Sequence, residues 1–366
     1  MAALGIADDV IRRAVATADA VSASTGAKVD ITELLTGRAA LAGLSPQGRL
    51  SAGGASRLIP TGDGWCALTL SRDDDLAAVP ALLEADAVPT DPWPAVHAWA
   101  AQLPTAQVVD RAVLLDLPVA ALGEAEAAAP RVLGCGTAGP ARGVDGLLVV
   151  DMTSMWAGPL CGRLLGAGGA TVVKVESPTR PDGTRAGDPR FFDWVNTGKL
   201  SYAVDFDADR DALWDLLAVA DIVLEGTRAA TLARRGLGPH DCPPKPGRVW
   251  LSITGHSDPR RVAFGDDAAV AGGLVGRTAD GPVFVGDAIA DPLTGLTAAA
   301  AVVEALSHGG GVHIAVAMAA VAATYAPTSA ATTDASPVLP EIGPPASALG
   351  ADNEAVQRLV AEKGWA

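Results

Sequence analysis

Four short apolar runs alternate with helix-like segments in the second half of the chain. The runs are residues 147–150, 171–175, 222–224 and 249–253. Strands that are apolar on both faces are typical of a parallel sheet covered by helices. Residues 157–165 and 211–218 have the composition of the crossover helices that parallel strands require. The sequence therefore predicts an α/β fold with a Rossmann-like parallel sheet.

The segments on either side of these runs predict a second, smaller α+β domain. Residues 5–44 have a helical pattern, and a Gly-Asp-Gly turn separates two strand-like pieces at 56–60 and 65–70. The other expected elements are helices at 76–85, 93–103, 292–306 and 353–361 and an apolar strand or helix at 314–323. We expect a small domain at 1–124, an Ala/Gly/Pro-rich linker at 125–143, and the Rossmann-like domain with a C-terminal tail at 144–366.

Charge and cysteine usage exclude several classes of function. The formal net charge of -15 disfavours nucleic acid and anionic membrane surfaces as partners. The four cysteines form no CxxC pair and the histidines do not cluster, so neither a metal site nor a disulfide framework is expected. The apolar stretch 314–326 is shorter than the roughly 20 residues of a membrane helix, and the N-terminus has no basic signal region. A cytoplasmic protein is expected.

Five motifs occur in a characteristic order within residues 145–255. They are DGLLVVD at 145–151, WAGP at 156–159, ATVVKVE at 170–176, NTGK at 196–199 and LSITG at 251–255. In this order they resemble the class III CoA-transferase family, which includes formyl-CoA transferase, carnitine CoA-transferase and 2-methylacyl-CoA racemase. The resemblance implies an enzyme acting on an acyl-CoA thioester and a carboxylic acid, with coenzyme A as part of the substrate and no permanently bound cofactor.

The order of the domains differs from the family pattern. In the family the small domain follows the strands of the Rossmann-like sheet, whereas here the corresponding segment precedes them. The chain is therefore predicted to be circularly permuted, which exposed termini and linkers tolerate. The resemblance also implies a homodimer, and family members are interlocked dimers; whether a permuted chain keeps the interlocking is left open.

The first motifs imply a CoA site at the carboxyl ends of the strands, where open α/β sheets bind ligands. By resemblance, Met155, Trp156 and Ala157 line the adenine and ribose, and Lys199 and Arg228 bind the phosphates. On residue type alone, Trp156 would be a core residue and the two cations would be solvated. The ordered set of motifs favours the CoA site.

Further residues are assigned to the same site by resemblance. They are Arg185, Thr254, Gly255 and His256, with His256 in the pantetheine wall and without a proton-transfer role. The pair Gly53-Gly54 aligns with a glycine loop that covers the covalent intermediate in the transferases. Most Gly-Gly pairs are simply turns, and this chain has only two of the glycines, so the lid function is open.

Asp291 is the predicted catalytic residue. The segment 286–295 resembles the family segment that carries a nucleophilic aspartate at the start of a helix. Such a carboxylate attacks the thioester carbonyl and becomes an aspartyl-CoA thioester, and the helix N-terminus is expected to keep it ionised. From the pattern alone, Asp291-Pro292 would be a helix cap and first helical residue, worth about 1 kcal/mol. The two roles are compatible.

Two other interpretations remain. The family's racemases carry a histidine where Asp266 stands and a glutamate at about Arg72, so racemisation by that pair is disfavoured. A substitute carboxylate within 73–75 is conceivable, although a solvated turn is the simpler interpretation. The third hypothesis is a non-catalytic CoA-binding subunit. The GxGxxG pattern at 134–139 is interpreted as linker, because Pro140 follows and no helix begins there, and Cys135 within it is not expected to be a catalytic thiol.

Overall fold

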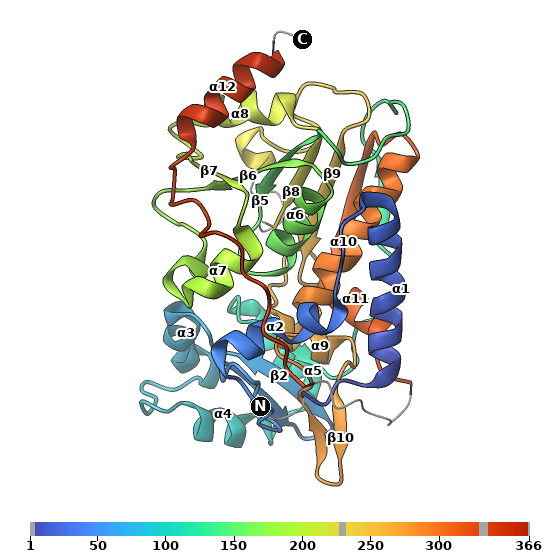
Figure 1. Ribbon diagram of the computed structural model, residues 1–366. Helices are drawn as coiled ribbons and strands as arrows, with labels where there is room; N and C mark the ends of the chain where they lie inside the picture. The colour runs from blue at the N-terminus through green and yellow to red at the C-terminus, as the bar shows by residue number, and fades with distance from the viewer. Residues whose placement is uncertain (1–3, 227–231, 329–335, 365–366) are drawn as a thin grey trace.

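A parallel sheet forms the centre of the structure (Figure 1). The computed structural model describes residues 4–226, 232–328 and 336–364. Within these ranges the sheet has seven strands in the order β4-β12-β9-β8-β5-β6-β7. The strands are β4 (Arg131–Gly134), β5 (Leu148–Met152), β6 (Thr171–Glu176), β7 (Leu200–Ala203), β8 (Ile222–Glu225), β9 (Val249–Thr254) and β12 (Val312–Ala317). All neighbours are parallel except β4, which runs antiparallel to β12. The predicted α/β fold with a Rossmann-like sheet is confirmed.

The strand order reverses at the centre of the sheet. Along the chain, β5 is followed by β6 and β7 on one side, and the chain then returns to place β8, β9 and β12 on the other side. This is the order of dinucleotide-binding folds, in which ligands bind beyond the carboxyl ends of the strands where the order reverses. The reversal lies between β5 and β8.

Helices cover both faces of this sheet because its strands are apolar on both faces. Val149 of β5 packs into one core with α1 (Asp8–Thr25), α2 (Ile31–Ala42), α6 (Ala157–Ala167) and α10 (Ala290–Ser307). Leu148 and Val150 point the other way, into a core with α8 (Arg210–Val219) and α12 (Asn353–Gly364). Figure 1 shows α1 beside α10 on one side of the molecule and α12 beside α8 at the far end.

A small antiparallel sheet forms the lower part of Figure 1. It has the order β1 (Ser56–Pro60), β2 (Trp65–Thr69) and β3 (Val119–Ala121), and it is covered by α3 (Asp73–Leu83), α4 (Trp93–Ala100) and α5 (Thr105–Leu114). On its other face, Val270 and Ala271 of α9 (Gly265–Ala271) pack against it. The remaining elements are α7 (Pro189–Asn196), α11 (Met318–Tyr325), the hairpin β10 (Gly276–Thr278) and β11 (Gly281–Val283), and two short 3-10 helices at Gly183–Ala186 and Ala233–Arg235.

Three expectations about chain organisation differ from the structure. Helices α1 and α2 lie in the core of the large sheet, not in the small domain, because their apolar faces match α10 and α6. Residues 131–134 are no linker: they form β4, which closes the edge of the sheet on β12, and Cys135 and Gly136 continue the contact by donating to the carbonyl of Gly311. The apolar segment at 314–323 is the end of β12 followed by α11. Within the described residues, no helix is long and apolar enough to cross a membrane.

Candidate functional site

Asp291 lies in the first turn of α10 and is not its cap. The N-cap position is occupied by Ile289, and no side chain caps the helix. The capping interpretation of the Asp-Pro pair is therefore wrong. Two left-handed residues, Gly286 at φ 67° and Ala288 at φ 43°, shape the turn that leads into the helix. The Asp291 side chain is thereby free to face neighbouring elements.

The N-terminus of α9 lies directly against the Asp291 carboxylate. A Cβ on Gly265, the first residue of α9, would stand 2.3 Å from Asp291 Oδ2 and 2.3 Å from the carbonyl oxygen of Ala288. No side chain fits at this position without displacing the carboxylate. Gly265 therefore allows a close approach of backbone to the predicted nucleophile.

Burial gives Asp291 a raised pKa of about 7, contrary to the expectation of a permanently ionised group. The cause is desolvation of the charged form, which outweighs the attraction of Arg38 and the hydrogen bond from the backbone N–H of Ala157 at the start of α6. The carboxylate of Asp266 adds to the increase. Near neutral pH, Asp291 thus exchanges between acid and carboxylate.

Asp266 and Asp287 act on Asp291, and a further carboxyl group, Asp267, lies beside Asp266. Asp266 accepts hydrogen bonds from Ser56 Oγ at 3.1 Å and from the N–H of Ala288 at 3.1 Å, and burial raises its pKa to about 6. Asp267 is completely buried and has a pKa raised by burial to about 7. The third is Asp287, which is also buried. Within the described residues, no group of His, Cys, Asp or Glu is arranged to hold a metal ion, these carboxyls included.

Arg38 of α2 is the cation of this cluster. Its Nη1 donates to Asp287 Oδ1 at 2.6 Å, and the positive charge lowers the pKa of Asp291 relative to burial alone. The guanidinium carbon lies 5.6 Å from the ring centroid of Trp156 and 5.5 Å from that of Phe191. Arg38 thus joins the carboxyl cluster to the aromatic residues beside α6.

The turn at Gly53 and Gly54 lies next to Arg38. Both glycines are exposed, and Gly54 has a φ of 83°, which favours glycine. A Cβ on Gly53 would be 3.8 Å from Arg38 Nη2. The resemblance predicts a lid over the nucleophile for these glycines, and the structure places the turn beside Arg38, whose charge acts on Asp291.

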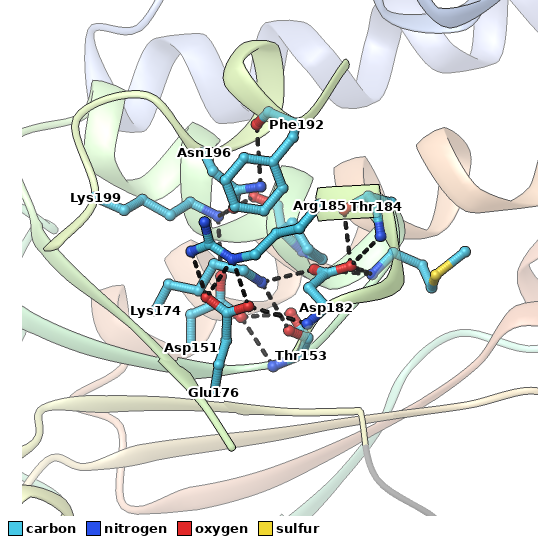
Figure 2. Close-up of polar contacts among 12 residues, drawn as sticks. Asp151, Thr153, Lys174, Glu176, Asp182, Thr184, Arg185, Phe192, Asn196 and Lys199 are labelled. Atoms are coloured by element: carbon cyan, nitrogen blue, oxygen red, sulfur yellow. Dashed lines mark hydrogen bonds and ion pairs between the residues drawn. The ribbon is translucent and has the colours of Figure 1, made fainter. Parts of the chain in front are cut away.

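Lys199 differs from the expected phosphate ligand. It is buried, and its ammonium donates to Asp151 Oδ2 at 2.9 Å, to the Pro159 carbonyl at 2.8 Å and to Asn196 Oδ1 at 3.0 Å (Figure 2). These three acceptors match the three N–H groups of an ammonium, so none is left for a phosphate. The alternative of a solvated side chain is wrong as well.

Arg185 belongs to the same buried polar network. It pairs with both carboxylate oxygens of Glu176, with Nη2 at 2.6 Å from Oε2, and stacks on Phe192 at 4.2 Å (Figure 2). A neighbouring pair, Lys174 and Asp182, is joined at 2.8 Å, and Asp182 also accepts from the backbone N–H of Met155 at 3.2 Å. The network therefore holds the loop after β5 in place.

The residues of the loop after β5 differ in their exposure. Met155 is 42% exposed at the carboxyl end of the sheet, with a φ of 73°. Trp156 is buried, with its ring 5.4 Å edge-on from that of Phe191 and its Nε1 without a partner among the described residues. Ala157 is buried at the start of α6. Arg228, predicted to bind a phosphate, lies outside the described residues.

The loop after β9 is packed against the rest of the protein. The Thr254 hydroxyl donates to the carbonyl of His256 at 2.8 Å, and a Cβ on Gly255 would lie 2.7 Å from the backbone nitrogen of Ala263. His256 is only 4% exposed, which contradicts the simpler interpretation of a solvated loop histidine. Burial, assisted by Arg261, lowers its pKa to about 4, so the ring is neutral at physiological pH.

One of the two racemase positions, Arg72, holds a structural ion pair. Arg72 occupies the N-cap position of α3 and pairs with Asp75, and residues 73–75 form the first turn of that helix, in which Asp73 and Asp74 are exposed. Asp75 is buried in this pairing, so it is not a free base. Asp266 therefore has no second base of the expected kind at Arg72.

Sequence reasoning missed Arg38 and Asp287 as site residues. Arg38 lies within a helical segment assigned to another domain, and its ion pair spans 249 positions of sequence. Asp287 stands only four residues before Asp291, and its acidic type within the same segment was the available signal.

Comparisons with known proteins agree with the ordered motifs. The model of CoA-transferase family III matches residues 144–351. A succinyl-CoA:mesaconate CoA-transferase of Haloarcula hispanica is 32% identical over 189 residues, covering 45% of this chain and 48% of the relative. A probable fatty acyl-CoA transferase of Mycobacterium tuberculosis is 34% identical over 190 residues, covering 47% and 48%. A crystal structure of a hypothetical protein from Mycobacterium tuberculosis has 31% identity and a TM-score of 0.46, covering 51% of this chain and 56% of that one.

The chain spans about half the length of the curated relatives that it matches. The family match itself covers more than half of this chain and contains Asp291, Met155 and Lys199. By this match, the chain belongs to CoA-transferase family III.

Proposed function

We propose that this protein transfers CoA from an acyl-CoA thioester to a carboxylic acid, with Asp291 as the nucleophile. The observation that carries the proposal is the placement of Asp291 in the first turn of α10, against Gly265 and facing the N–H of Ala157. A carboxyl group with a pKa of about 7 is a better nucleophile, once ionised, than an ordinary solvated carboxylate, because nucleophilicity rises with basicity.

The proposed reaction has two halves. An oxygen of Asp291 bonds to the thioester carbonyl carbon, the C–S bond breaks, and CoA leaves as a thiolate. The thiolate then attacks the Asp291 side of the resulting anhydride, which releases the donor acid and leaves an aspartyl-CoA thioester. The acceptor acid reverses these steps and departs as its CoA thioester, so the Asp291 carboxylate is regenerated.

The N-terminus of α6 suits the charge that develops in each step. Tetrahedral intermediates at the Asp291 carbonyl carry an oxyanion, and an unpaired backbone N–H at a helix start is a preorganised donor for it. Ala157 supplies such an N–H beside this carboxyl group. Gly265 keeps the other side of the carboxyl group free of a side chain.

We place CoA beyond the carboxyl ends of β5 and β8, with the exposed Met155 at the adenine. Trp156, Ala157, Thr254, Gly255 and His256 would shape the wall behind it, because all are at least partly buried there. Arg228 remains the predicted phosphate ligand, whereas Lys199 and Arg185 support the loop from beneath. The acyl group would lie toward the small sheet, under Gly53 and Gly54.

Two relatives indicate which substrates to test first. Their names include a succinyl-CoA:mesaconate and a succinyl-CoA:glutarate CoA-transferase, so succinyl-CoA with mesaconate or glutarate is the first pair. A homodimer and a cytoplasmic location remain predictions. Racemisation is less well supported, since Arg72 is bound to Asp75.

The decisive experiment is intact-protein mass spectrometry of wild type and Asp291→Asn after incubation with succinyl-CoA and with longer acyl-CoAs. A CoA or acyl adduct on the wild type that the variant lacks, and that hydroxylamine removes, supports covalent transfer. Incorporation of deuterium at the α-carbon without an adduct would favour a racemase. CoA binding with neither result would favour the non-catalytic subunit.

A further inference from the structure

Arg38 has hydrogen-bonding capacity that the protein does not use. Nη1 is engaged by Asp287, whereas Nε and Nη2 have no acceptor in the part of the chain that the structure describes. These two nitrogens are also absent from the fully buried atoms without partners, and the side chain is 31% exposed. The N–H groups of Nε and Nη2 are therefore open to a ligand.

The position of these donors is defined by their neighbours. Nη2 is close to the turn at Gly53, where a Cβ would be 3.8 Å away. One side of the guanidinium lies against Trp156 and Phe191, and another is held by Asp287. The donors without an acceptor therefore lie beside the glycine turn, on a guanidinium whose charge acts on Asp291.

The negative charge of the carboxyl groups near Arg38 makes its positive charge important for binding an acid. Arg38 pairs with Asp287 and acts on Asp291, and Asp266 also acts on Asp291; these carboxyl groups would repel an incoming carboxylate. A guanidinium is well matched to such a ligand, because its fork of donors binds carboxylates in two parallel hydrogen bonds. In the described cluster, Arg38 is the group able to offset this repulsion.

We propose that Arg38 binds the reacting carboxylate of the acceptor acid and holds it for attack on the aspartyl-CoA thioester. This inference rests on the proposed function of Asp291. One carboxylate oxygen bonds to the thioester carbonyl carbon of Asp291 while the C–S bond breaks and CoA leaves as a thiolate. The other oxygen stays on Arg38. The thiolate then attacks the acceptor's carbonyl carbon, and the anhydride C–O bond breaks to return the Asp291 carboxylate.

The assignment predicts an effect on the binding of free acid. Free acid binds only for discharge of the CoA adduct, so the KM for the acid reports on Arg38, whereas the KM for the acyl-CoA does not. The donor carboxylate leaves by the same step in reverse, so the rate of adduct formation should fall as well. Loss of Arg38 also raises the pKa of Asp291 further, because a positive charge is removed, so wild type and variants are compared over a pH series from about 7 to 9.5.

The test compares Arg38→Gln and Arg38→Lys with Arg49→Gln as the matched control. Arg49 is an exposed arginine that stacks on Trp65 and donates to the Asp280 carbonyl, away from the carboxyl cluster. Succinyl-CoA serves as donor, and butyrate and glutarate serve as acceptors with one and two carboxylates. We expect Arg38→Gln to raise the KM for both acids by roughly 100-fold and to leave the KM for succinyl-CoA within about 2-fold of the wild-type value.

Arg38→Lys keeps the positive charge but removes the paired N–H donors of the guanidinium, so it tests whether two parallel hydrogen bonds are needed. It should fold with Asp287 paired and raise the KM for the acids by about 10-fold. In an Arg38→Ala variant, added guanidinium ion should restore part of the discharge rate. These variants keep the inference testable if Arg38→Gln does not fold.

Three outcomes would contradict the assignment of Arg38 as the residue that binds the acceptor. Lower rates with an unchanged KM for the acids would make Arg38 a positioning residue for Asp291 and Asp287. A loss confined to glutarate would place its ligand at the distal carboxylate. Absence of any adduct on the wild type would instead refute the proposed function itself, and the inference with it.

Discussion

Lys199 provides a test that distinguishes the buried ion pair of the structure from the phosphate-binding role that the resemblance implies. Replacing Lys199 by Met would leave Asp151 completely buried with its main counter-ion gone. Breaking a buried pair in this way costs about 3–5 kcal/mol. For 366 residues the entropy of unfolding is about 0.8 kcal/mol/K, so we expect Tm to fall by about 4–6 °C. The affinity of the folded protein for CoA should not change.

Differential scanning calorimetry and CoA titration of the same preparations measure both quantities. Lys28→Met is the matched control, because Lys28 is an exposed lysine without a buried partner, and its Tm should stay within about 1 °C of wild type. The double variant Lys199→Met/Asp151→Asn should recover part of the loss, since no unpaired charge remains. If Tm hardly changes and the Kd for CoA rises about 10- to 100-fold, Lys199 binds a phosphate and the buried network has been misread.

Three further predictions concern the carboxyl cluster. The rate of adduct formation should rise with pH through about 7, as Asp291 loses its proton, and a flat profile between pH 5.5 and 8.5 would contradict the raised pKa. Gly265→Ala should slow adduct formation about 100-fold by displacing Asp291, whereas Gly136→Ala, with open space around it, should leave the rate unchanged. The pKa of Asp267 is raised to about 7 in the folded state, so the free energy of unfolding should fall as pH rises from about 4 to 7. Denaturant titrations at several pH values measure this dependence. In Asp267→Asn the decrease in the free energy of unfolding should be smaller by up to about 1.4 kcal/mol per pH unit.

The parallel strands and the start of α10 could be predicted because their signals are local. A run such as residues 171–175 is apolar on both faces, and this is a property of consecutive residues. β4 could not be predicted in this way. Its residues are exposed and lie in a Gly- and Pro-rich segment, and they become a strand only because β12 offers an open edge.

Lys199 shows a second limit of sequence reasoning. Its place at the end of a family motif suggested a surface cation, but whether a lysine faces a ligand or an aspartate depends on which strand lies beside it. β5 carries Asp151 at that position, 48 residues earlier. The same holds for His256, which is buried and whose Nδ1 lies 4.0 Å from Oε1 of Glu124, a residue from a remote part of the chain.

The candidate site combines parts of the chain that differ in their relation to the family. Asp291, Gly265 and Ala157 lie inside the matched range 144–351, whereas Arg38 and the turn at Gly53 precede it. The groups proposed to form and stabilise the aspartyl thioester thus come from the matched part. The groups proposed to bind the acceptor come from the part before it. A change of acceptor would therefore be achieved most readily by substitutions around Arg38 and Gly53, because these leave the contacts between Asp291, Gly265 and Ala157 intact.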